Sequence, residues 1–131
     1  MQFDTGSLTK NQLDAILNKV PIDITFIDAE DTVRYFNMPE NRTFVRPKAV
    51  LGRKVQNCHP QKSLHAVNKI VESFKNGEKA VAEFWLTLHD RFVYIRFFPV
   101  QDADGKYYGA IEVVQDVTDI KKLEGERRLL D

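Results

Sequence analysis

With 131 residues, the chain has the length of one ordinary domain, enough to bury its own core and too little for two domains of normal size. It is 43% hydrophobic and 29% charged, with 19 basic and 19 acidic residues, so it is expected to be globular, with neither nucleic acid nor an anionic membrane as a partner. A single cysteine excludes an internal disulfide, and the apolar stretches are short and lack a signal peptide, so the expected location is the cytoplasm.

The first 20 residues are predicted to form an amphipathic flanking helix. Thr9 and Gln12 have the spacing of a capping box, which starts the helix, and Pro21 ends it. Its apolar residues fall on one helical face: Leu13, Ile16, Leu17 and Val20. This face needs a partner surface.

The next segment predicts a β-hairpin and then a helix. Residues 22–28 and 32–37 are rich in β-forming side chains and flank a short charged turn. Four Pro or Gly residues interrupt residues 38–60, which are expected to form short helical turns and loops. Apolar residues then recur at helical spacing over 63–76, with Gly77 as the expected C-cap.

The second half of the chain predicts three antiparallel strands in a meander, over residues 78–88, 92–100 and 107–117. Large apolar side chains point to both sides of the middle strand, with Val93, Ile95 and Phe97 on one side. The sheet is therefore expected to be covered on both faces, one by the central helices and the other by the first helix or a second subunit.

The end of the chain predicts the beginning of a connector helix over residues 120–131. Apolar and long side chains there follow a and d spacing, namely Ile120, Leu123, Arg127 and Leu130. Fewer than two heptads are present, so the segment is expected to begin a longer helix.

This order of elements resembles the PAS fold over roughly residues 20 to 119. Residues 24–28 and 33–37 are similar to the opening hairpin of that family, and Gly52-Arg53 is similar to a step before its short helix. Asp116-Val117-Thr118 resembles the Asp-x-Thr hinge that joins the last PAS strand to a signalling helix. The strings at 55–60 and 82–85 resemble the C-terminal PAS module of bacterial DUF438/hemerythrin-like proteins.

The resemblance implies an α+β fold: a five-stranded antiparallel sheet, with short helices and one long helix on one face, between N- and C-terminal flanking helices. The expected divisions are the flanking helix over 1–20, the PAS domain over 21–119 and the connector helix over 120–131.

The resemblance also implies a non-enzymatic sensory and dimerisation module in signal transduction. Its partners would be an unidentified small molecule and a second copy, which would pair through the N- and C-terminal helices. The hinge residues Asp116 and Thr118 would report the state of the pocket. Since PAS relatives hold ligands between the long helix and the inner face of the sheet, the expected pocket residues are Cys58, His65, Val67, Val93, Ile95, Phe97, Glu112 and Val114.

An alternative is a haem- or metal-binding redox or gas sensor, because Cys58, His59 and His65 carry ligand chemistry. Oxygen-sensing PAS relatives place their ligand histidine in the long helix, at a position nearer Val67 than His65. The alternative without a ligand is that Cys58 is a small buried hydrophobic residue and that the two histidines form hydrogen bonds with backbone groups. A further alternative is a structural dimerisation unit with a filled core.

Photoactive flavin is disfavoured. The flavin-binding members of the family need Gly-Arg-Asn-Cys in succession, whereas here Gly52-Arg53 is separated from Asn57-Cys58 by Lys54-Val55-Gln56. Val114 also stands where those members carry a flavin-bonding Gln. Nucleophilic catalysis by Cys58 and His59 is disfavoured too, because adjacent residues rarely point at one another and no oxyanion loop is evident.

Glu112 lies within a β-strand pattern, and the register of the last strand that the PAS resemblance implies makes it the expected acid of the pocket. A buried carboxylate needs a partner, so the other interpretation is a structural ion pair with Arg96 or another strand cation. As a pocket acid, Glu112 would favour a cationic, hydrogen-bond-donating or metal-containing ligand.

Overall fold

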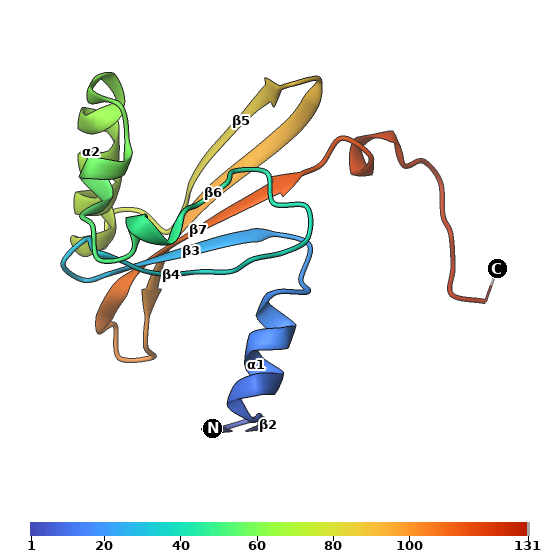
Figure 1. Ribbon diagram of the computed structural model, residues 1–131, viewed down its shortest axis with the longest axis horizontal. Helices are drawn as coiled ribbons and strands as arrows, with labels where there is room; N and C mark the ends of the chain where they lie inside the picture. Colours follow the sequence, from blue (N-terminus) through green and yellow to red (C-terminus); the bar gives the residue numbers. More distant parts are fainter. Residues whose placement is uncertain (131) are drawn as a thin grey trace.

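The fold of residues 1–130 is described from a computed structural model (Figure 1). The strands are β1 (Gln2–Phe3), β2 (Gly6–Ser7), β3 (Asp23–Asp28), β4 (Val33–Phe36), β5 (Ala82–Leu88), β6 (Arg91–Gln101) and β7 (Tyr107–Asp116). The α-helices are α1 (Lys10–Leu17) and α2 (Leu64–Lys75). Four short 3-10 helices complete the fold: η1 (Lys48–Val50), η2 (Val55–Cys58), η3 (Gln61–Ser63) and η4 (Ile120–Lys122).

Five strands form one antiparallel sheet in the order β4-β3-β7-β6-β5. The hairpin β3–β4 joins the meander β5–β6–β7 through the pairing of β3 with β7. This confirms the predicted α+β fold with a five-stranded antiparallel sheet. The elements agree with the sequence pattern: the hairpin, the irregular segment, the long helix and the meander all lie where they were expected. Gly77 ends α2 with φ of 72°, as its predicted C-cap role requires.

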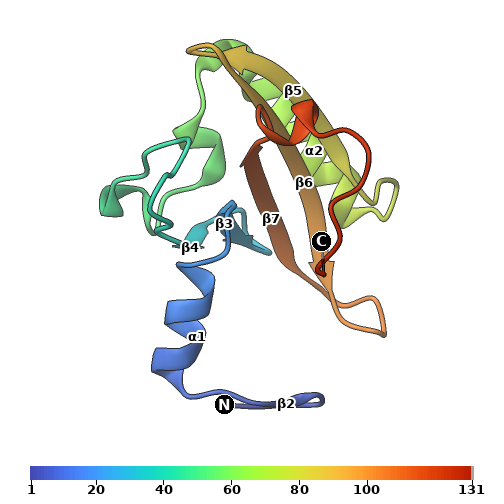
Figure 2. The same cartoon turned by 90° about the vertical axis from the view of Figure 1, so that its right-hand side faces the viewer.

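One face of the sheet, here called the inner face, is covered by α2 and the segment with the short helices η1 to η3 (Figure 2). Val71 and Phe74 of α2 pack in the core against Ile27 of β3 and Ala110 of β7. Because residues paired across antiparallel strands point to the same side, this face also carries Thr25, Phe97 and Glu112. The inner face therefore holds both the core and the site described below.

The other side of the sheet, here called the outer face, is left largely open within residues 1–130. The first helix does not cover it as one option predicted, and cover by a second subunit stays a prediction. Its apolar residues include Ile24, Phe26, Trp85, Tyr94, Phe98, Ile111 and Val113. Each remains at least partly exposed, and Trp85 is 60% exposed. Helix α1 projects away from the sheet and leaves this face open (Figures 1 and 2).

Helix α1 begins as predicted and ends earlier than predicted. The Thr9 hydroxyl accepts from the Gln12 amide, and the Gln12 side chain accepts from the Thr9 amide, which confirms the capping box. The regular helix stops at Leu17, one short turn before Pro21. None of its residues is buried, and Ile16 is 46% exposed.

After the last strand, the chain forms one turn of 3-10 helix, η4, and residues 123–130 are not helical. The predicted connector helix over 120–131 is therefore not formed in the described part of the chain, apart from η4. Isolated helical segments this short are marginal without a packing partner. No helix within residues 1–130 is both long and apolar enough to span a membrane.

Candidate functional site

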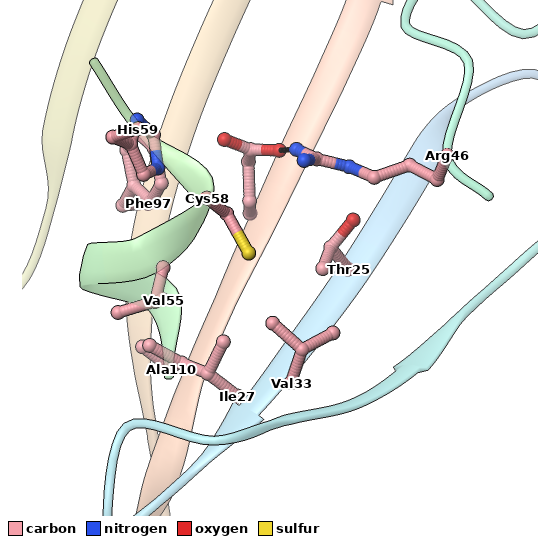
Figure 3. Close-up of a pocket in the computed structure, with 10 residues that line it drawn as sticks. Thr25, Ile27, Val33, Arg46, Val55, Cys58, His59, Phe97 and Ala110 are labelled. Atoms are coloured by element: carbon pink, nitrogen blue, oxygen red, sulfur yellow. Dashed lines mark hydrogen bonds and ion pairs between the residues drawn. The ribbon is translucent and has the colours of Figure 1, made fainter. Parts of the chain in front are cut away.

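A small cavity of about 30 Å³ lies between the inner face of the sheet and the short helix η2 (Figure 3). A water molecule needs roughly 10–15 Å³ of such space, so the void is only a few atoms in size. Its lining combines apolar groups with a few polar ones: Thr25, Ile27, Val33, Arg46, Val55, Cys58, His59, Phe97, Ala110 and Glu112.

A second void of about 30 Å³ adjoins the first and continues beneath α2. The two share part of their lining, including Ile27, His59 and Phe97. The second is lined on the helix side by Val67, Ile70, Val71 and Phe74. The pair of voids therefore lies between the long helix and the sheet.

The expected pocket residues divide into two groups. Cys58, Phe97 and Glu112 line the first void and Val67 lines the second. The others do not line either void: His65, Val93, Ile95 and Val114. His65 is exposed at the start of α2, whereas the two valines are packed into the inner face with 0% and 1% exposure.

The Glu112 carboxylate forms an ion pair with Arg46, whose Nη2 lies 2.6 Å from Oε1 (Figure 3). Both side chains are mostly buried, at 19% and 14% exposure. The second carboxylate oxygen, Oε2, has no hydrogen-bond partner within residues 1–130. Arg46 Nε is buried and also lacks a partner within that range. The cavity thus has balanced charge and two unused polar atoms.

The sequence did not predict Arg46 as the ion-pair partner of Glu112. The predicted pairing of Glu112 with Arg96 is wrong. Arg96 pairs across the sheet with Val113, so it lies on the outer face, where its guanidinium donates to Gln115 and stacks over Tyr94 and Phe98. Strand alternation could have excluded it, because Val113 and Glu112 point to opposite faces. Arg46 comes from an irregular loop that has no periodic signal.

His59 and Cys58 bring further polar chemistry to the wall of the cavity. Burial lowers the pKa of His59, an effect that Glu112 opposes and Arg46 reinforces, so the neutral imidazole is favoured. The Cys58 thiol contacts the Lys54 carbonyl at 3.7 Å. No three His, Cys, Asp or Glu side chains of residues 1–130 are grouped to hold a metal ion, so Cys58, His59 and His65 do not form a three-ligand site.

The expected hinge residues lie at the end of β7. Asp116 accepts from Arg91 Nε at 2.7 Å and from the Thr118 hydroxyl at 2.6 Å, and the Thr118 oxygen accepts from the Phe92 amide. The bonds from Arg91 and Thr118 lower the pKa of Asp116 to about 2. These contacts fasten the end of the last strand to the beginning of β6.

Comparisons with known proteins agree with this arrangement. The family model described as PAS domain matches residues 13–118. The C-terminal domain of a Streptococcus mutans protein has 32% identity and a TM-score of 0.89, covering 95% of this chain and 96% of that one. The PAS domain of Bordetella pertussis BvgS has 23% identity and a TM-score of 0.60, covering 81% and 84%.

A sensory box sensor histidine kinase from Vibrio cholerae has the same fold, with 14% identity, a TM-score of 0.56, and coverage of 81% of this chain and 89% of that one. No curated protein sequence matches the chain. The match to the family model spans most of the chain, and the S. mutans domain is similar over nearly all of it. The chain belongs to the PAS domain family.

Proposed function

We propose that this PAS domain is a non-enzymatic sensory module in signal transduction, and that its cavity between η2, α2 and the sheet binds a small molecule. The observation that carries the proposal is the free Oε2 atom of Glu112 at a mostly apolar, partly enclosed void. The chemistry of the lining, apolar with a few convergent polar groups, is that of ligand sites in general, although this void is much smaller than most of them. The sensory box sensor histidine kinase from Vibrio cholerae shares the fold and supports the sensory role.

The ligand class follows from the charges around the cavity. Arg46 neutralises Glu112, so a cationic ligand would lose much of the attraction that an unpaired carboxylate would provide. A neutral ligand that donates a hydrogen bond can still use Oε2. Since the voids measure about 30 Å³ each, the ligand has to be small or the wall has to open. That wall consists of the short helix η2 and its neighbouring turns.

Glu112→Gln is expected to weaken binding of a neutral amide about 10-fold, because hydrogen bonds to charged acceptors contribute about 1.5–3 kcal/mol. The probes are acetamide and nicotinamide, compared with acetate and nicotinate, and binding is measured by NMR shifts of amides in β7 and α2. Glu83→Gln is the matched control, because Glu83 is an exposed strand residue bonded to Tyr94 on the outer face. Preference for the carboxylates, or equal loss in the control, would contradict the assigned ligand class.

We further propose that the domain functions as a homodimer. The apolar side of α1 is exposed at Ile16, and the outer face of the sheet presents an uncovered apolar surface. Amphipathic helices and apolar sheet faces of this kind need burial. Placing α1 of one copy against the outer face of another would satisfy both. The C-terminal residues Ile120, Leu123 and Leu130 are also exposed and provide a second proposed contact.

Ile16→Glu is expected to weaken the dimer at least about 10-fold, because it places a charge in the apolar contact. Light scattering of the complete 131-residue chain over a dilution series measures the effect. Asn11→Glu is the control, since Asn11 is an exposed residue on the same helix. A parent protein that remains monomeric at the highest concentration would contradict the proposal.

The similarity to a C-terminal domain from Streptococcus mutans supports a place for this domain within a larger protein. We propose that the larger protein is of the DUF438/hemerythrin-like kind, on the basis of the strings at 55–60 and 82–85. In that setting the domain would sense a small molecule and pass the signal to its neighbours through its flanking segments.

A further inference from the structure

Asn37 joins the end of helix α1 to the sheet. Its side chain is completely buried, at 0% exposure. Its Oδ1 accepts from the Ile24 amide at 2.7 Å, and its Nδ2 donates to the carbonyls of Leu17 and Ile22 at 2.8 and 2.9 Å. One amide group therefore holds the last residue of α1, the connector after it and the first part of β3.

Arg42 holds Asn37 from the other side. Its Nη1 donates to the Asn37 carbonyl at 2.8 Å and to Oδ1 at 3.1 Å. Its Nη2 lies 3.3 Å from the hydroxyl oxygen of Thr25, a residue that lines the cavity. Its guanidinium also lies over the ring of Phe36, 5.5 Å from the centroid. Arg42 thus bridges the cavity wall and the joint of α1.

The same loop carries Arg46, four residues later, which pairs with Glu112 inside the cavity. Between the two arginines, the Asp23 carboxylate accepts from the amides of Thr43 and Phe44 at 2.8 and 3.1 Å. Loop 42–46 is therefore fastened to the cavity at one end and to the joint of α1 at the other. Both arginines belong to this five-residue loop. If one guanidinium moves, the other guanidinium or the backbone between the two residues has to move as well.

We propose that the state of the Arg46–Glu112 pair is transmitted to helix α1 through Arg42 and Asn37, so that occupation of the cavity controls how firmly α1 is held. This rests on the proposed ligand site and adds an output at the N-terminal side of the domain. A ligand that engages Glu112 Oε2 redistributes charge around Arg46, and loop 42–46 follows. Because α1 buries none of its residues, the bonds of Asn37 at its C-terminal end have a large share in fixing its direction.

The inference is tested by amide hydrogen exchange on the complete chain, with no small molecule added. Glu112→Gln removes the charge of the pair from the cavity side. It is expected to accelerate exchange of the Asn18, Val20 and Ile24 amides about 10-fold, because the opening free energy of the α1 joint falls. Arg42→Gln removes the bridge and is expected to have the same effect.

The double variant decides whether the two residues act along one route. In the Arg42→Gln background, Glu112→Gln is expected to cause no further acceleration, since coupled residues are not additive. Glu83→Gln, on the outer face, should leave the exchange rates of the Asn18, Val20 and Ile24 amides unchanged. Arg42→Lys retains the charge without the forked contacts and should accelerate exchange as Arg42→Gln does, which keeps the test usable if that variant folds poorly.

Two results would overturn the inference. Exchange of the Asn18, Val20 and Ile24 amides could be unchanged in Glu112→Gln, or Glu112→Gln could accelerate it equally in the parent and in the Arg42→Gln background. Both are distinct from failure of the proposed ligand site, which is measured by amide binding to the parent protein. If Glu112→Gln accelerates exchange at Asn18, Val20 and Ile24 in a protein that binds neither acetamide nor nicotinamide, the connection to α1 is supported and only the ligand class is rejected.

Discussion

Gly109→Ala is expected to prevent stable folding of the domain. Gly109 has a φ of 145°, and a Cβ added there would lie 1.9 Å from the carbonyl oxygen of Ile27 and 2.9 Å from the Cα of Asp28. Both atoms belong to the backbone of β3, which pairs with β7 at the centre of the sheet. Neither can move without breaking the pairing of these strands. The expected loss exceeds about 4 kcal/mol, a large part of the roughly 5–15 kcal/mol that stabilises a domain.

Gly105→Ala is the matched control for this substitution. Gly105 also has a positive φ, 85°, in the turn between β6 and β7, but no atom lies within 4 Å of an added Cβ. Only the backbone strain remains, which costs about 1–2 kcal/mol. Urea denaturation followed by circular dichroism measures both variants. Equal midpoints for the two would show that β3 does not approach Gly109 this closely.

Local patterns were sufficient to predict most elements of the fold. The Thr9/Gln12 capping box acts within one turn, the apolar spacing of α2 reflects its buried side, and β6 is rich in β-forming residues. These signals depend on neighbours in the chain, so they can be interpreted without knowledge of the tertiary structure. The predicted inward direction of Glu112 depends instead on the strand register that the PAS resemblance implies, and Glu112 does line the first void.

The partners of the site residues could not be predicted in this way. Arg42 and Arg46 lie in a loop without periodicity, which Asp23 fastens to the start of β3. Arg46 lines the cavity, and Arg42 contacts it through Thr25. No spacing in the sequence connects residue 46 to residue 112. For Cys58, His59 and His65, closeness in the sequence was misleading. Helix α2 begins at Leu64, between the first two residues and the third, and His65 is exposed on it.

The flanking segments show a third limit. The expected cover over both faces of the sheet and the expected connector helix each depend on burial that one copy of the chain does not provide. Amphipathic spacing indicates that a face needs a partner and does not say which molecule supplies it. The proposed dimer would provide that burial for the Ile16 side of α1.

The second large effect is expected from Phe74→Ala, which should destabilise the domain by about 3–5 kcal/mol, the usual range for a buried phenylalanine. Phe74 is 2% exposed on the inner side of α2 and packs in the core that joins the helix to β3 and β7. It also lines the void beneath α2, so the deleted ring enlarges an existing cavity that the surrounding backbone cannot fill by collapse.

Phe84→Ala serves as the control, because Phe84 is 45% exposed near the free edge of the sheet and meets Phe97 edge-on with 6.2 Å between ring centroids. Its loss is expected to be about 1 kcal/mol, from partial burial and one aromatic contact. Phe97→Ala should fall between the two, since Phe97 is half-buried and borders both voids. The order of denaturation midpoints therefore reports how α2 sits on the sheet: a Phe74 variant as stable as the Phe84 variant would mean that α2 does not close the cavity from above.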